Sequence, residues 1–82
     1  MGELEAARPY YQQALDIYRE VLGEKHPDTA LSLNNMGYLL FLQGRHTKAL
    51  DFYEKALLSH DTNERRVLEN IALLERVRAE TN

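Results

Sequence analysis

The sequence predicts an all-α protein whose four helices pack as antiparallel hairpins. Two observations support this fold class: apolar residues recur at steps of three and four, and only two prolines and four glycines divide the chain. A third is an internal repeat, in which the first segment matches the third and the second matches the fourth. With 82 residues, 44% of them hydrophobic, the chain is long enough for one small core.

The first helix is expected over residues 3–22, because its apolar residues form one stripe at helical spacing: Leu4, Ala7, Tyr11, Ala14 and Tyr18. Gly23 suits the C-terminal end of this helix, and Pro27 suits the first turn of the next one. Asp28 would lie favourably near the positive end of that second helix.

The remaining helices are expected at three ranges: residues 28–43, 47–59 and 62–80. Gly44 ends the first of these. Asp61 and Glu64 have the spacing of a capping box, which predicts the start of the last helix.

The internal repeat has two different shifts. Residues 2–15 match residues 44–57 at a shift of 42, with five identities: Gly2/Gly44, Ala7/Ala49, Tyr11/Tyr53, Ala14/Ala56 and Leu15/Leu57. The second and fourth helices match at a shift of 35: Leu33/Leu68, Asn35/Asn70 and Leu39/Leu74 coincide, and Gly37/Ala72 is similar. The period shortens because the second connection lacks the insert LGEKHP, and such self-similarity indicates a helical array.

The spacing of small and aromatic residues resembles the signature of the tetratricopeptide repeat (TPR), carried by Gly37, Gly44, Ala49, Tyr53 and Ala56, and repeated at Ala7, Tyr11 and Ala14. The long 42-residue form is similar to the repeats of kinesin light chain and nephrocystin-type proteins. The sequence departs from the family's pattern at Leu40, His46, Glu75 and Ala79.

This resemblance implies a right-handed α-solenoid fragment that forms a single unit over residues 1–82. Its helices would alternate as B, A, B and A: helix B at 3–22, a complete repeat at about 28–60, and helix A at 62–80. It also implies a protein-binding scaffold.

On the second helix, one stripe predicts the core: Ala30, Leu33, Gly37 and Leu40. Gly37 would let the partner helix approach closely, opposite Ala49 and Ala56, which explains a glycine inside a helix. The aromatic residues expected to pack in the core or between helices are Tyr10, Tyr11, Phe52 and Tyr53.

In TPR proteins the A helices line a concave groove, so the resemblance implies a peptide-binding surface formed by Leu31, Asn34, Asn35, Tyr38, Phe41, Leu42, Arg66, Glu69, Asn70, Leu73 and Arg76. An asparagine amide offers both donors and an acceptor, which match a peptide backbone, and Asn35 and Asn70 occupy equivalent positions. Two alternatives stay open. Asn34 or Asn35 instead bonds a neighbouring helix or solvent, and Tyr38 and Phe41 instead pack between adjacent A helices.

Catalytic, metal-binding and cofactor-binding functions are not expected. The chain has no cysteine, its three histidines have no i,i+4 partner, and there is no glycine-rich phosphate loop. A helix cap explains His60, Asp61 and Glu64 better than a metal does. The net charge of −3, with acidic residues among the C-terminal arginines, argues against nucleic acid, and no apolar run is long enough for a membrane span.

Two functions remain. One is a peptide-binding scaffold; the other is a structural or self-assembling unit, either truncated or engineered, that forms a homo-oligomer. The residues expected to associate are Leu4, Tyr11, Val67, Ile71, Leu74 and Val77. Head-to-tail stacking of the last A helix against the first B helix competes with a two-fold dimer and with helix exchange. The N-terminus does not resemble a signal peptide, and we expect a cytoplasmic protein.

Overall fold

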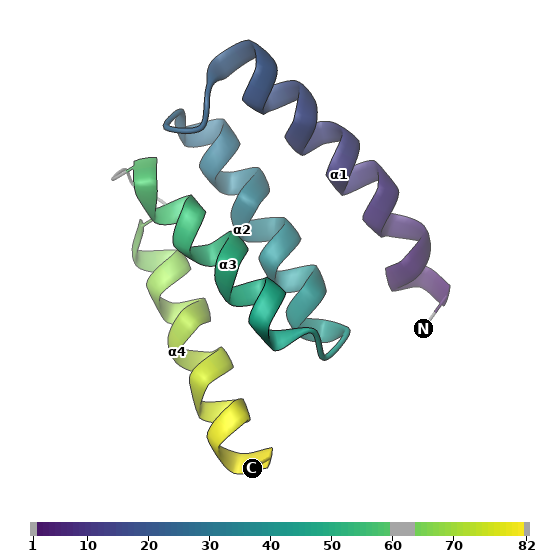
Figure 1. Ribbon diagram of the computed structural model, residues 1–82, viewed down its shortest axis with the longest axis vertical. Coiled ribbons are helices and arrows are strands. Elements are labelled where there is room, and N and C mark those ends of the chain that lie inside the picture. Colours follow the sequence, from purple (N-terminus) through teal and green to yellow (C-terminus); the bar gives the residue numbers. More distant parts are fainter. Residues whose placement is uncertain (1, 60–63, 82) are drawn as a thin grey trace.

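The computed structural model describes residues 2–59 and 64–81, which form four α-helices and one short 3₁₀-helix: α1 (Gly2–Leu22), α2 (Pro27–Leu42), α3 (His46–Ala56), η1 (Leu57–Ser59) and α4 (Glu64–Thr81). Neighbouring helices run antiparallel, with α1 and α4 at opposite edges and α2 and α3 between them (Figure 1). The molecule measures 39 × 29 × 15 Å, and the smallest dimension fits two layers of helices. The predicted all-α fold of antiparallel helix pairs is confirmed.

The ends of α1 and α2 follow the turn residues of the sequence. Gly23 and Gly44 have positive φ values of 87° and 80°, a conformation that glycine adopts without strain. Pro27 begins α2, as predicted. The cap of α2 was not predicted: His26 Nδ1 accepts a hydrogen bond of 3.1 Å from the backbone N–H of Asp28.

Most helix boundaries differ from the sequence prediction by one to three residues. The α-helical part of α3 ends at Ala56, and residues 57–59 continue as the tighter η1, whereas we predicted one helix over 47–59. α1 begins at Gly2 and continues through Pro9. The predicted capping residue Asp61 lies outside the described residues, and α4 begins at Glu64.

The core lies where α2 and α3 pack together and meet α4, and it also includes Leu15 of α1. Its buried members are Leu15, Leu33, Met36, Leu39, Leu40, Ala49, Tyr53, Ala56, Val67 and Leu74. All four residues of the predicted core stripe on α2 are buried, so that prediction is confirmed.

Gly37 marks the closest approach of α2 and α3. A Cβ atom at this position would lie 2.6 Å from Cδ1 and Cε1 of Tyr53 and 3.2 Å from the carbonyl oxygen of Ala49. Real Cβ atoms do not come so close to ring carbons, so only glycine fits here without a shift. The predicted contact with Ala49 is confirmed, while the nearest obstacle is the ring of Tyr53 rather than Ala56.

Three predictions about packing are wrong. Tyr10 is 73% exposed, so it does not pack in the core or between helices. Val67 and Leu74, which we expected to associate between chains, are 0% exposed, since they pack into the core. Ile71 and Val77 beside them are half-buried. The open face of α4 carries other residues, among them Leu68, Ala72 and Leu73.

Candidate functional site: a tyrosine cleft between α1 and α2

A cleft runs along the junction of α1 and α2. Among the described helices α1 contacts only α2, so one side of this helix pair is uncovered. Two cavities of about 340 and 190 Å³ lie there, and both include Tyr11 and Asn35. We call them together the tyrosine cleft; it is lined by Ala7, Tyr11, Ala14, Tyr18, Asp28, Leu31, Ser32, Asn35, Tyr38, Leu39 and Leu42.

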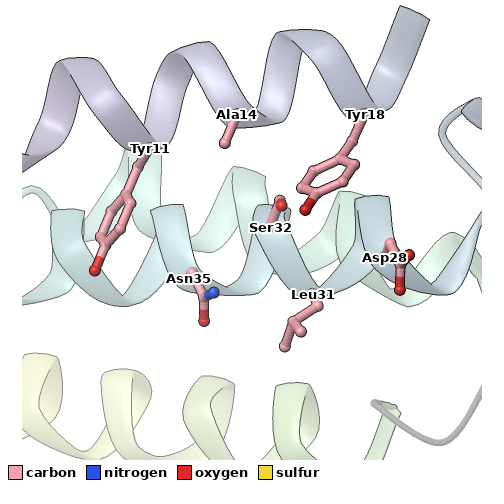
Figure 2. A pocket seen from close by; sticks show the side chains of 7 residues that line it. All are labelled: Tyr11, Ala14, Tyr18, Asp28, Leu31, Ser32 and Asn35. Atoms are coloured by element: carbon pink, nitrogen blue, oxygen red, sulfur yellow. The ribbon is translucent and has the colours of Figure 1, made fainter. Parts of the chain in front are cut away.

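The cleft exposes three large apolar side chains to solvent. Tyr11, Tyr38 and Leu42 are 44%, 45% and 48% exposed. In Figure 2 the rings of Tyr11 and Tyr18 extend from α1 over α2, whereas Leu31 and Asn35 extend from α2 toward the side where α4 lies. Clustered exposed aromatic and aliphatic side chains of this kind mark interaction sites.

Polar groups lie beside the apolar ones. Asp28 is the only charged residue among those that line the tyrosine cleft, and the side chain of Asn35 is exposed. The tyrosine hydroxyls and the amide of Asn35 offer both hydrogen-bond donors and acceptors. An apolar surface with a few polar groups is suited to an amphipathic polypeptide segment.

Asn34 and Asn35 have different environments although they are adjacent. Asn34 is 2% exposed, and its Oδ1 accepts a hydrogen bond of 3.0 Å from Nδ2 of Asn70 on α4. Asn34 therefore joins two A-type helices, the alternative that the sequence had left open. Asn35 remains available on the surface of the tyrosine cleft.

Phe41 also packs within the chain. Its ring stacks on His46 at the start of α3, with centroids 5.5 Å apart, and lies 6.3 Å from the ring of Tyr38. Of this aromatic pair, only Tyr38 is among the described residues that line the cleft.

The α4 residues of the predicted groove do not line the tyrosine cleft. Arg66, Glu69, Leu73 and Arg76 are all exposed on α4. Nε of Arg76 lies 3.8 Å from Oε1 of Glu80 on the same helix. Of the predicted groove residues, the cleft brings together four, all from α2: Leu31, Asn35, Tyr38 and Leu42.

Sequence reasoning foresaw only part of the contribution of α1 to the site. Tyr11 was expected to associate between chains, whereas Ala7, Ala14 and Tyr18 were interpreted only as packing residues of the same stripe. Its signal was nevertheless visible, because tyrosine hydroxyls at helical spacing are better suited to a partly wet surface than to a dry core.

Other buried polar groups serve the fold. Thr29 is fully buried and donates a hydrogen bond of 3.3 Å to the backbone carbonyl of Tyr18, which ties the start of α2 to α1. Burial raises the pKa of Tyr53 to about 12, and the nearby phenol of Tyr38 adds to this effect. Arg19 and Glu24 form an ion pair of 3.0 Å at the turn that follows α1.

Within the described ranges 2–59 and 64–81, no group of three or more histidine, cysteine, aspartate or glutamate residues is arranged to hold a metal ion. No helix in this part of the chain is long and apolar enough to cross a membrane.

Comparison with known proteins identifies the family. The profile of the tetratricopeptide repeat family matches residues 1–57, which is more than half of the chain. The chain belongs to the tetratricopeptide repeat family. In the repeat order expected from the sequence, α2 and α3 would be the A and B helices of one repeat, α1 a preceding B helix and α4 a following A helix.

A curated relative agrees with this assignment. Tetratricopeptide repeat protein 19, mitochondrial, of Danio rerio is 38% identical over 47 residues, which cover 57% of this chain. The matched part spans only 12% of that protein's length. No solved structure matches the chain significantly.

Proposed function

We propose that the chain is a non-enzymatic scaffold that binds a polypeptide segment in the tyrosine cleft. Tetratricopeptide repeats generally mediate protein–protein interactions and are typically not enzymes. The observation that carries the proposal is the uncovered junction of α1 and α2, where Tyr11, Tyr38 and Leu42 are each more than two-fifths exposed beside Asn35. Burying such side chains would supply most of the binding free energy.

The chemistry of the cleft defines the expected ligand. Its apolar floor accommodates leucine-like or small side chains at helical spacing, and Asn35 can pair with a carbonyl, amide or carboxylate group. Asp28 lies at the end of the cleft that is nearest the turn before α2, so we expect a basic group at the corresponding end of the ligand. The ligand is therefore an amphipathic segment with an apolar face and at least one positive charge.

The exposed α4 residues extend this surface in the proposal. Arg66, Glu69, Leu73 and Arg76 would contact the part of a longer ligand that extends beyond α2. The proposed unit is the whole chain, residues 1–82, and its insert LGEKHP is consistent with the long 42-residue repeat type. We propose a cytoplasmic location; the word mitochondrial describes the Danio rerio relative.

The test is a display screen of random helical peptides against the chain. Tyr38→Ala and Asn35→Ala should each weaken binding of the selected peptides by about 10-fold or more, because both residues line the cleft. Glu54→Ala is the matched control: Glu54 is exposed on α3, outside the tyrosine cleft, and its removal should leave affinity unchanged. Equal loss in all three variants, or selected peptides that ignore Tyr38, would refute the placement of the site.

A further inference from the structure

We propose that the tyrosine cleft binds α4 of a second copy of this chain, so that copies associate head to tail. The inference rests on the proposed function, because it names the partner of the same cleft. Inside the chain, α2 packs against α3 and α4. The sequence repeat gives the equivalent residues on α4, α1 and α2, and these show which contacts two copies would make.

The internal packing provides the reference geometry. The glycine of α2 lies against the ring of Tyr53 on α3. Asn34 of the same helix accepts a hydrogen bond from Asn70 on the next A helix, α4. In a head-to-tail array, α4 of one copy would take the place of α2 in these two contacts. In the next copy, α1 would take the place of α3, and α2 would take the place of α4.

The two repeat shifts map these contacts onto a second copy. At a shift of 35 Gly37 corresponds to Ala72, and at a shift of 42 Tyr53 corresponds to Tyr11. Ala72 of one copy would therefore lie against the ring of Tyr11 of the next. Both are exposed in the single chain, so both are free to make this contact.

The polar contact maps equally well. Asn34 corresponds to Glu69, and Asn70 corresponds to Asn35. The exposed amide of Asn35 in the cleft would thus donate to the carboxylate of Glu69, a charge-assisted version of the bond inside the chain.

Two opposite charges map onto apolar positions of the internal packing. Leu40 belongs to the core and Leu50 packs against it; their equivalents are Glu75 on α4 and Arg8 on α1. Two apolar positions of the internal packing are thus occupied by opposite charges at the junction between copies. This correlated replacement favours a second copy over an unrelated helix.

A second pair of opposite charges lies at the other end of the junction, near the start of α2. In the internal packing, residues 34 and 70 lie opposite each other. The shift of 35 turns this pair into residue 69 of one copy opposite residue 35 of the next. One helical turn earlier, residue 65 would then lie opposite residue 31. There the guanidinium of Arg65 would lie within reach of Asp28, the charged residue of the cleft. Apolar contacts together with complementary charges favour a specific interface.

Sedimentation equilibrium of the 82-residue chain over a concentration series tests the proposal. We expect the average mass to rise above the 9.5 kDa of one chain. Arg8→Glu and Glu75→Arg should each weaken association by about 10-fold or more, since each places like charges opposite one another. Neither residue is in the core, so circular dichroism and thermal unfolding should be unchanged for both variants.

An equimolar mixture of the two variants distinguishes the arrangements. In a head-to-tail chain every junction between one variant and the other joins opposite charges, so alternating association should be recovered well above that of either variant alone. A two-fold dimer through the cleft would leave Glu75→Arg fully associated, and a dimer through α4 would leave Arg8→Glu fully associated. Either outcome overturns the proposal, as does a 9.5 kDa mass for the wild type at every concentration.

The two proposals fail in different ways. A chain that stays monomeric but binds selected peptides through Tyr38 and Asn35 would refute the second copy and leave the scaffold function intact. A chain that stays monomeric and binds no peptide would refute both.

Discussion

Replacing Gly37 by alanine tests the close approach of α2 and α3. The sign of the change in the free energy of unfolding decides between helix propensity and packing. Helix propensity alone predicts a gain of about 1 kcal/mol, because alanine is the better helix former. The structure predicts a loss. The new methyl group would lie 2.6 Å from two ring carbons of Tyr53, whereas carbon atoms prefer separations of about 3.5–4.0 Å.

The magnitude follows from the surroundings of Tyr53. Its ring is fully buried, so it has no open space to move into when it is displaced by about 1 Å. Overpacking of this kind costs about 1–3 kcal/mol, which exceeds the propensity gain. We expect Gly37→Ala to lower the free energy of unfolding by about 1 kcal/mol, or the melting temperature by roughly 4–8 °C. Gly37→Leu should lower it by several kcal/mol.

Urea unfolding followed by circular dichroism measures the effect. Ala72→Gly is the matched control, because residue 72 occupies the equivalent position on α4 and is exposed; it should cost about 1 kcal/mol from propensity alone. In a Tyr53→Leu background Gly37→Ala should become neutral or stabilising, since the ring carbons are gone. A stabilising effect of Gly37→Ala in the wild type would refute the reasoning.

Three further predictions concern stability. Asn70→Ala should cost about 1–3 kcal/mol in urea unfolding because it leaves buried Asn34 without its donor, while Asn35→Ala should cost little; equal effects would contradict the hydrogen bond. Because the folded-state pKa of Tyr53 is raised to about 12, the unfolded chain ionises first, and stability should fall as the pH rises above about 10, by roughly 1.4 kcal/mol at pH 11. Tyr53→Phe should lack this component of the alkaline loss, and an identical pH dependence would count against it. Pro9→Ala should raise stability by about 1–3 kcal/mol, since proline removes a backbone donor inside α1; unchanged helicity and unfolding would argue that this turn is already frayed.

The fold was largely predictable because local chemistry determines it. Gly23, Gly44 and Pro27 fix where helices end and begin, and the stripe through Gly37 fixes which face of α2 packs inward. His26 as a helix cap was not predictable in the same way, since histidine is not among the preferred capping residues.

The site was less predictable because its surfaces depend on which neighbours a helix has. Tyr11 and Tyr53 occupy equivalent positions in the repeat, yet Tyr53 is fully buried and Tyr11 is 44% exposed. Periodicity gives the face of a helix but not whether another helix covers it. The same limit explains Val67 and Leu74, which have the spacing of any packing face and turn out to belong to the core.

Asn34 and Asn35 illustrate the same point at the level of single residues. Sequence equivalence paired Asn35 with Asn70 at a shift of 35. The hydrogen bond, however, joins successive A helices, so it connects Asn70 to Asn34, one residue away. A repeat alignment shows which residues correspond. Which residues touch also depends on how far neighbouring helices are offset along their axes.

Intermolecular paramagnetic relaxation tests the central claim most directly. The chain has no cysteine, so Arg76→Cys provides one site on α4 for a spin label. When this unenriched labelled chain is mixed with ¹⁵N-labelled wild type, we predict broadening of the amides around Tyr11 and Asn35. A spin label at Glu54→Cys on α3 should leave those amides sharp. Broadening confined to α3 or α4, or none at concentrations where the chains associate, would contradict the account.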